Sequence, residues 1–440
     1  MGYQVFYSDP KITSQAGFGR VVHLPCILDS RPGYHRLGSE YLIERGVGVW
    51  LPFGERPTDP RRAPTAQSIK NYAFWLANFL EWCEVRQIDL CQCSFLNDIQ
   101  ERYQSEMLSG KWSQQGFPLS VSTVNLRTHQ ACDFLFWMAY KGYRPEFTLP
   151  QNKISIKENS SSTSPSQHSD SSQATKSKAT PGKSKLRMPT DNKVVDWLNR
   201  IYESAGETEG LLCELILVSA MRREEVAAFR VDTIPENPAD WDIPNPLAPI
   251  SEQQVCVQIR YGTKGKCFGY DHGDKIGPAR EIKIPLEMAE RIHIYRRKVR
   301  PIFLKKWIQS APTLLEKRNR ISSSVHLFLN RKSGNRITGR DLYSIWISTP
   351  LPIKGWSPHQ GRHWWACSIL WREFRNHQKL PNSTSHEAPL NFTPFGLNII
   401  RLIIQPQLGH SHENTTLIYL RWFSDMVGNG LSIAYDLDKR

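Results

Sequence analysis

The chain lacks several features that would assign it to large functional classes. It has no apolar run long enough to span a bilayer, and residues 1–5 do not begin a basic region followed by a hydrophobic one, so we expect neither a membrane anchor nor a signal peptide. It has no Gly-x-x-x-x-Gly-Lys-Ser/Thr loop for nucleotide phosphates and no His-Glu-x-x-His motif. It also has no carboxylate constellation typical of two-metal nucleases. We therefore expect chemistry that needs no cofactor.

Paired cysteine spacing is absent too. The chain has nine cysteines, an odd number, and they are scattered along it. The only close pair, Cys91 and Cys93, has no second Cys or His pair at ligand spacing, which argues against a zinc site. Cys132, Cys213 and Cys367 lie in apolar stretches and are expected to be buried thiols. This usage is typical of a reducing compartment, so we expect a cytoplasmic protein.

Acidic residues are in short supply. The chain has 56 Lys and Arg against 42 Asp and Glu, which gives a formal net charge of +14. Such a surplus favours a polyanionic partner, because cations that neutralise phosphates release condensed counterions. Charge alone leaves three alternatives open: a nucleic acid, an anionic membrane surface, or a surface that is merely basic.

Two segments have no clear globular pattern. Residues 1–63 mix prolines with short β-like runs at 20–24 and 47–51, and we interpret them as an N-terminal extension of unknown role. Residues 151–187 are rich in Ser, Thr and Lys and contain no aromatic residue. Such a segment cannot bury enough surface to order itself, so we predict a flexible linker.

Residues 64–150 have helical periodicity. Apolar residues recur every three or four positions in a first helix, which either Thr65 or Ser68 caps, and a second helix is expected at about 121–141. We predict a small helical domain. Cations on its polar faces and in a later turn either follow a DNA backbone or are simply solvated; the candidates are Lys70, Arg127 and Lys266.

Residues 188–425 are expected to be mostly helical with a small antiparallel β-sheet. The run 255–260 alternates like a strand, and 280–285 reads as its return strand after a turn-rich segment. A further helix is expected at about 339–347. Residues 426–440 form a C-terminal tail that could contact another protomer. The fold class predicted for the whole chain is mostly α, with the sheet confined to this second domain.

Residues suited to attack on a phosphodiester recur in this domain. Arginine binds phosphate bidentately and stays charged, and histidine can donate to the same oxygens or move a proton. A lysine on a turn can protonate a leaving oxygen. A tyrosine can attack once cations or a base activate it, because its ordinary pKa is about 10. The candidates are Arg222, Arg362, His359, His410, Lys264 and Tyr419.

Each motif alone has an ordinary structural explanation, since Gly409 could end a helix and Arg222 could simply pair with Glu225. The order and spacing of the set, however, resembles the tyrosine recombinases, the phage-integrase-type site-specific recombinases. Residues 220–226 are similar to that family's Gly-Leu-Arg-x-x-Glu-Leu box, and 359–363 to its His-x-Leu-Arg-His box. Residues 408–419 match its Leu-Gly-His and Thr-Thr-x-x-Tyr elements, and 262–266 its lysine-bearing β-turn. The likeness covers about residues 64–425.

The resemblance implies a helical core-binding domain followed by an α+β catalytic domain that cuts and rejoins DNA. Carried over, Arg222, Arg362 and His410 would clamp the scissile phosphate, and Lys264 would protonate the 5′ oxygen. His359 would accept the proton of Tyr419, which would form a 3′-phosphotyrosine link. Glu225 would hold the helix of the first arginine, and His363 would support packing.

The implied partners are double-stranded recombination sites, a homotetramer on paired sites, and accessory bending or directionality factors. The protein would then be associated with the nucleoid and would integrate or excise a mobile element. A type IB topoisomerase-like or telomere-resolving enzyme would use the same residues. The alternative from another class is a DNA-binding accessory factor that has lost catalysis, although the complete residue set argues against it.

The sequence departs from the family pattern in four places. Gly361 replaces a leucine, which should loosen one core contact, and Arg223 adds a second cation beside the first arginine. Residues 372–398 form a longer insertion than expected. The turn offers three possible general acids, namely Lys264, Lys266 and Lys275.

Overall fold

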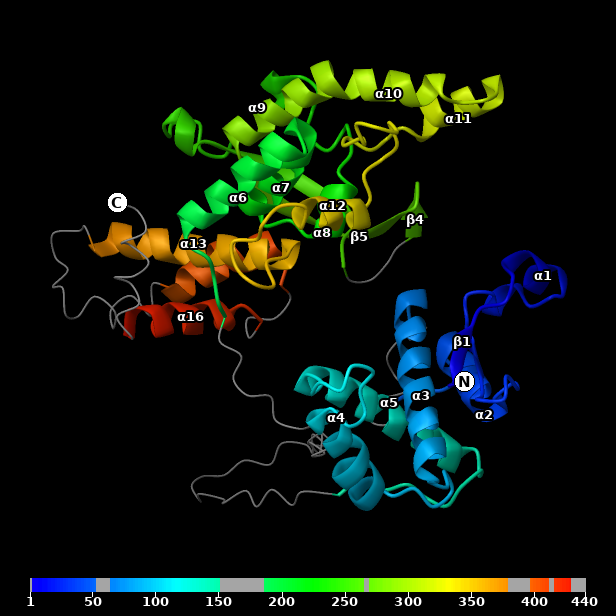
Figure 1. Cartoon of the computed structure of the whole chain (residues 1–440). Coiled ribbons are helices and arrows are strands. Elements are labelled where there is room, and N and C mark those ends of the chain that lie inside the picture. Colours follow the sequence, from blue (N-terminus) through cyan, green and yellow to red (C-terminus); the bar gives the residue numbers. More distant parts are fainter. Residues whose placement is uncertain are drawn as a thin grey trace, which may run out of the picture. The chain divides into compact units, whose positions relative to one another are not determined.

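The chain folds into two compact units, Met1–Ser184 and Lys185–Arg440, which we describe separately (Figure 1). The computed structural model describes residues 2–52, 64–150, 186–264, 269–378, 396–410 and 415–428. Most of the expected linker, a large part of the 372–398 insertion, Lys266 and most of the C-terminal tail lie outside these residues. No helix of the described part is long and apolar enough to cross a membrane.

Unit 1 is a helical assembly with one two-stranded sheet. Its elements in chain order are β1 (Gln4–Phe6), α1 (Pro10–Gln15), η1 (Gly19–Val21), β2 (Cys26–Leu28), α2 (Arg36–Val47), α3 (Ala66–Arg86), the π-helical η2 (Phe95–Gln104), α4 (Ser105–Ser109) and α5 (Val121–Tyr140). The two long helices α3 and α5 confirm the prediction of a helical segment. Thr65 is the N-cap of α3, because its side chain accepts a hydrogen bond from the amide of Ser68.

The prediction of β-like runs at 20–24 and 47–51 is wrong. Residues 19–21 form a 3-10 turn, and Val47 ends helix α2, which Gly48 caps in the left-handed conformation. The strand that pairs with β1 is Cys26–Leu28 instead, with Val5 opposite Ile27. Strand preference depends on which neighbours are available, and that information is not local to the sequence.

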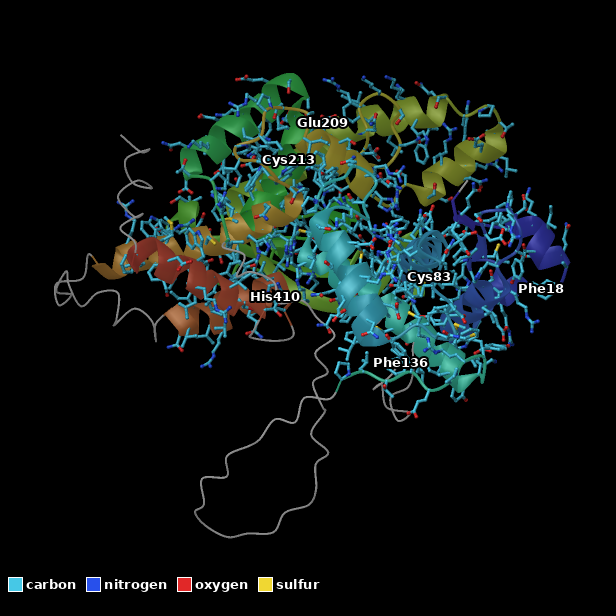
Figure 2. The ribbon with its side chains drawn as sticks, turned by 60° about the horizontal axis from the view of Figure 1, so that its bottom comes forward. Phe18, Cys83, Phe136, Glu209, Cys213 and His410 are labelled. Carbon is cyan, nitrogen blue, oxygen red and sulfur yellow. The ribbon has the colours of Figure 1, made fainter. Side chains whose placement is uncertain are left out.

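The core of unit 1 joins its N-terminal residues to the long helices. Ile27 and Tyr41 are fully buried in the same cluster as Phe79 and Trp137. The hydroxyl of Tyr41 donates to Asp133 on α5 over 2.5 Å. Residues before the first long helix therefore complete the core of this unit, and Figure 2 shows Cys83 among its packed side chains.

Unit 2 contains more than half of the described helices and a three-stranded antiparallel sheet in the order β3-β5-β4. Its elements are α6 (Asp191–Ser204), α7 (Glu207–Ser219), α8 (Arg223–Ala227), η3 (Pro238–Asp240), η4 (Ile250–Glu252), β3 (Gln254–Tyr261), β4 (Gly269–Asp271), β5 (Asp274–Pro285), α9 (Leu286–Ile294), η5 (Tyr295–Val299), α10 (Arg300–Gln309), α11 (Leu314–Ser323), α12 (Gly339–Trp346), α13 (Pro358–Gln378), η6 (Ile400–Ile404), α15 (Gln405–Leu408) and α16 (Leu417–Gly428). Strands β3 and β5 and helix α12 confirm three predictions, and the fold is mostly α as expected.

Helix α7 lies at the centre of unit 2. Between Gly210 and Val218 it is apolar except for Glu214, and most of its residues are buried, as expected for a helix surrounded by other elements. Cys213 on this helix is completely buried (Figure 2), and Cys132 and Cys367 are also buried, which confirms the expectation for these three thiols. Because α7 is fixed by the core, the turn at its C-terminal end provides a rigid base for the side chains that follow.

Candidate active site

The first arginine lies directly after the end of α7. Ala220 adopts a left-handed conformation, with φ of 54°, and turns the chain so that Arg222 becomes the N-cap of α8. The Arg222 amide donates to Glu225 Oε2, and its Nη1 donates to Glu225 Oε1, both over 2.7 Å. Arg223 pairs instead with Glu224 at 2.7 Å. The structure therefore identifies Arg222 as the partner of Glu225.

Glu225 is the anion that holds the cations of the site. It is 1 % exposed, and besides Arg222 it binds Arg280 of β5, whose Nη2 lies 2.8 Å from Oε2 and whose Nη1 contacts Oε1. Burial alone would raise the pKa of this carboxyl, but the hydrogen bonds and charges of Arg280 and then Arg222 lower it to about 2. Arg280 was not predicted. It lies 55 residues from Glu225, and no local pattern marks it.

The second arginine lies on α13 and points at the same turn. Arg362 is 3 % exposed; its Nη1 donates to the carbonyl of Ala220 and its Nη2 to the carbonyl of Leu408 over 2.8 Å. Arg222 Nη2 donates to the same Leu408 carbonyl over 3.2 Å. Burial, followed by repulsion from Arg222, lowers the pKa of Arg362 to about 9. Two cations thus converge on one carbonyl oxygen.

The turn at 408–410 sets the position of the next histidine. Gly409 ends α15 with φ of 59°, and a Cβ at this position would lie 2.6 Å from Arg280 Cδ, so only glycine fits. His410 follows, and its Nδ1 lies 3.0 Å from the hydroxyl of Thr416. Burial and then the charge of Arg362 lower the pKa of His410 to about 4. The ring is therefore neutral near pH 7 in the free protein.

Tyr419 contacts a different histidine from the expected one. Its hydroxyl lies 2.8 Å from Nδ1 of His363, whereas His359 lies one helical turn earlier on α13, with its ring 4.4 Å from that of His363. The structure therefore places His363, and not His359, within hydrogen-bonding distance of the tyrosine hydroxyl, and the role of each histidine in proton transfer stays a prediction. Burial raises the pKa of Tyr419. Burial, followed by the neighbouring His359, lowers the pKa of His363 to about 3, which keeps it neutral and able to accept.

A cavity of about 380 Å³ opens beside the two arginines. Four of the predicted residues line it, and the complete lining is Arg222, Arg223, Glu224, Gly262, Lys264, Tyr343, Ser357, Pro358, His359 and Arg362. Neither Tyr419 nor His410 is among the described residues that line it, and Tyr419 is 1 % exposed. The cations face the cavity while the tyrosine is buried behind His363.

The three lysines proposed as general acid differ in position. Lys264 is exposed and lines the cavity, beside the buried Thr263. Lys275 lies on β5 opposite Tyr270 and is not part of the lining. Lys266 lies outside the described residues. Of the two lysines that can be placed, the geometry favours Lys264.

The structure explains why glycine replaces leucine at position 361. A Cβ there would lie 2.7 Å from the ring of Trp346 and 3.3 Å from Leu217. Trp346 is fully buried, 4.4 Å from the ring of Trp197 and 5.6 Å from that of Trp356. The expectation of a loosened contact is therefore wrong, because a tryptophan fills the space.

The two residues of unit 1 that are predicted to contact DNA differ in how exposed their side chains are. Lys70 is exposed on α3. Arg127 on α5 is only half-exposed, and its Nη1 donates to Asn78 over 3.0 Å. Contact with a phosphate stays a prediction for both residues.

Among the described residues, no group of three or more His, Cys, Asp or Glu is placed to hold a metal ion. The candidate groups of the site are cations held by Glu225, neutral histidines and one tyrosine. Such a set can hold an anion such as a phosphodiester and can transfer protons around it.

No protein-family model matches the chain, and no curated protein matches its sequence. Among solved structures, the XerH site-specific recombinase bound to palindromic difH substrate is similar, with a TM-score of 0.43 and 17 % identity over 84 % of this chain and 80 % of that chain. The Tn1549 transposon integrase in complex with circular intermediate DNA has a TM-score of 0.45 and 12 % identity over 87 % and 94 %. A lambda integrase dimer bound to a COC′ core site has a TM-score of 0.40 and 11 % identity over 86 % and 94 %. Likenesses of this degree do not establish an activity.

Proposed function

We propose that the chain is a DNA strand transferase of the tyrosine-recombinase type, which cuts and rejoins DNA through a 3′-phosphotyrosine intermediate. The observation that carries this proposal is the convergence of Arg222 and Arg362 on the Leu408 carbonyl, beside a cavity that Lys264 and His359 also line. These side chains come from segments far apart in the sequence. A phosphodiester in the cavity would meet two guanidinium groups already held in place.

The phosphate clamp is preorganised by its supports. Glu225 and Arg280 fix the position of Arg222, and the Ala220 carbonyl fixes that of Arg362. Donors held at the point where charge develops need no reorganisation during the reaction, and each is typically worth about 10²–10³ in rate. His410, next to the carbonyls that bind both arginines, completes the clamp.

In the proposed cleavage step, the phosphodiester is transferred from its 5′ oxygen to the tyrosine. Tyr419 Oη attacks the phosphorus, a P–Oη bond forms, and the bond from phosphorus to the 5′ oxygen breaks. The tyrosine proton passes to His363 Nδ1, and Lys264 Nζ supplies a proton to the leaving 5′ oxygen. Rejoining is the reverse, with a 5′ hydroxyl from another strand as the attacking group. The bond energy is conserved, so no nucleotide is consumed.

His363 is the proton acceptor in this scheme because it is the histidine that contacts the tyrosine. A pKa of about 3 would make it a weak base, but that value belongs to a site without an anion. A bound phosphodiester brings negative charge, which raises the pKa of nearby histidines. His359 lines the cavity, where it can donate to the phosphate.

The test is to trap the covalent intermediate. Wild type and the Tyr419→Phe variant are incubated with nicked, labelled duplex carrying the ends of the element that encodes the protein, and a denaturing gel is examined for a protein–DNA adduct. We expect an adduct with wild type that is absent from the variant. Tight binding without an adduct would favour the inactive accessory factor, and an adduct at another tyrosine would refute the assignment.

The proposal also includes an oligomeric state and a type of exchange reaction. Exchange between two duplexes requires paired sites and several protomers, so we propose a homotetramer that integrates or excises a mobile element. Supercoil relaxation without exchange of ends in the same reaction would favour a topoisomerase-like enzyme instead.

A further inference from the structure

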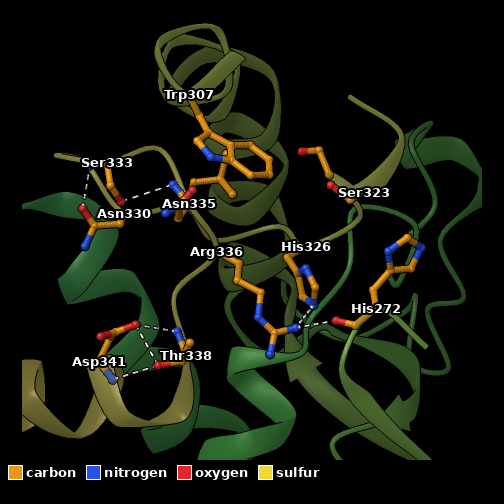
Figure 3. A pocket seen from close by; sticks show the side chains of 12 residues that line it. His272, Trp307, Ser323, His326, Asn330, Ser333, Asn335, Arg336, Thr338 and Asp341 are labelled. Carbon is orange, nitrogen blue, oxygen red and sulfur yellow. Dashed lines mark hydrogen bonds between the residues drawn. The ribbon is translucent and has the colours of Figure 1, made fainter. Parts of the chain in front are cut away.

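Two adjoining cavities lie in unit 2 beside α10 and α11, the helical hairpin labelled in Figure 1. Figure 3 shows the larger cavity. The larger has a volume of about 610 Å³ and the smaller about 280 Å³. Both are lined by Trp307, Ser333 and Asn335, so they form one continuous groove. We call it the hairpin groove.

The hairpin groove is rich in cations and neutral donors. Lys306 and Lys332 line its smaller part and are exposed, and no ion pair holds either of them in the described chain. Ser333 and Asn335 add a hydroxyl and an amide, the neutral groups that commonly bind phosphate oxygens. Residues 296–320 contain nine Lys and Arg and a single acid, Glu316, which accounts for more than half of the chain's surplus of +14.

The carboxylates at the groove are already occupied. Asp341 accepts hydrogen bonds from the amide and hydroxyl of Thr338, the N-cap of α12, over 2.9 and 2.7 Å. Glu316 pairs with Arg320 at 2.5 Å. Asp341 keeps its charge, because its partner is neutral, but it is the single acid among the residues that line the groove. The lining cations outnumber it, so the lining has a net positive charge; they are Lys306, Arg320, Lys332 and Arg336.

The floor of the groove is rigid. Arg336 Nη1 donates over 2.9 Å both to Asp274 Oδ1 and to the carbonyl of His272, as Figure 3 shows in part, and it lies 2.8 Å from His326 Nε2. Asp274 also lies 2.5 Å from His326, which is buried. Asp274 begins β5, so the groove is anchored to the sheet whose strand β3 leads into the turn with Lys264.

The groove lies next to the proposed active site. Thr338 and Asp341 line it, while Tyr343, two residues further along α12, lines the catalytic cavity. Gly339, the residue after Thr338, packs against Glu224 of the catalytic cavity, since a Cβ at Gly339 would lie 2.4 Å from Glu224 Oε1. The start of α12 therefore lies between the two cavities.

We infer that the hairpin groove binds the phosphodiester backbone of the DNA duplex beside the phosphate that is cleaved. Lys306 and Lys332 contact backbone phosphates, and Ser333 and Asn335 donate to the same oxygens. The inference rests on the proposed function, since it takes its ligand from there. It adds a contact surface that the catalytic residues do not include.

The test is the salt dependence of DNA binding in the full chain. The Lys306→Gln/Lys332→Gln double variant is compared with its parent, both carrying Tyr419→Phe so that no adduct forms, on a labelled duplex of mixed sequence. Binding is measured by fluorescence anisotropy over a range of salt concentrations. The slope of log K against log salt is negative, and loss of two phosphate contacts should make it shallower by about 1.8, since each contact contributes about 0.9.

The matched control is Lys298→Gln/Lys305→Gln, which removes the same charge from exposed positions of η5 and α10 outside the groove. A shallower salt slope in the groove variant alone, with unchanged thermal unfolding, supports the inference. Equal decreases of the salt slope in both variants, or no decrease in the groove variant, overturn the inference. If the parent still binds the duplex, neither outcome contradicts the proposed function. Loss of binding to phosphatidylserine vesicles with unchanged DNA binding also overturns it. A parent that binds no duplex contradicts the proposed function and, with it, the inference.

Discussion

Replacing Glu225 by glutamine should destabilise unit 2 by about 3 kcal/mol at pH 7. The carboxylate is 1 % exposed and lies between Arg222 and Arg280. Its pKa falls from the ordinary value of 4.5 to about 2, in spite of burial, which corresponds to about 3 kcal/mol because each tenfold change in proton affinity is worth about 1.4 kcal/mol. Breaking a buried ion pair typically costs about 3–5 kcal/mol, so two independent estimates agree.

The same substitution should change the response to acid. A carboxyl with a depressed pKa contributes its full stability above pH 4.5 and loses it as the pH falls toward 2. Wild type should therefore lose about 3 kcal/mol more than the variant between these limits. Urea unfolding at pH 7 and in acid measures this, with hydrogen exchange of peptides from unit 2 reporting on that unit alone.

Glu224→Gln is the matched control, because the side chain of Glu224 is 56 % exposed and pairs with Arg223 at the surface. It should cost less than about 1 kcal/mol, as exposed pairs do. If Glu225→Gln cost no more than this control, or kept the wild-type response to acid, the carboxylate would not be the anchor of the two arginines.

Two further substitutions test the site and its packing. His363→Gln keeps a hydrogen-bonding group beside Tyr419 but removes the base, so single-turnover cleavage of a nicked duplex should slow by about 10²-fold or more; a rate equal to wild type would return the role to His359. Gly361→Ala places a methyl group 2.7 Å from Trp346 and should cost about 1–3 kcal/mol in urea unfolding. Adding Trp346→Phe should then destabilise less than the sum of the single changes, and strict additivity would contradict the packing argument.

Much of the fold follows from local patterns in the sequence. The apolar spacing of α3 and α5 and the alternation of β3 are properties of short windows, and each was found close to its predicted place. The N-terminal strands were predicted in the wrong place because β1 pairs with Cys26–Leu28. Which segment pairs with a strand depends on tertiary contacts, and a short window of sequence does not contain them.

The candidate site was predictable in its members but not in its contacts. Sequence boxes pointed to Arg222, Arg362 and Tyr419, because the types and order of such residues are written in the chain. The role of Arg280 depends on bringing β5 against α8, and the partner of Tyr419 depends on which face of α13 meets α16. These are properties of packing, which no spacing rule encodes.

Helix α13 joins the two halves of the site. Successive residues of a helix point about 100° apart, so Arg362 faces the carbonyl of Leu408 while His363 faces the hydroxyl of Tyr419. The tyrosine is buried, its pKa is raised by that burial, and it does not line the cavity in the described chain. In the free protein the tyrosine is therefore neutral and shielded. If Tyr419 is the nucleophile, as we propose, we predict that α13 or α16 must shift on DNA binding before it can attack a phosphate held by the arginines.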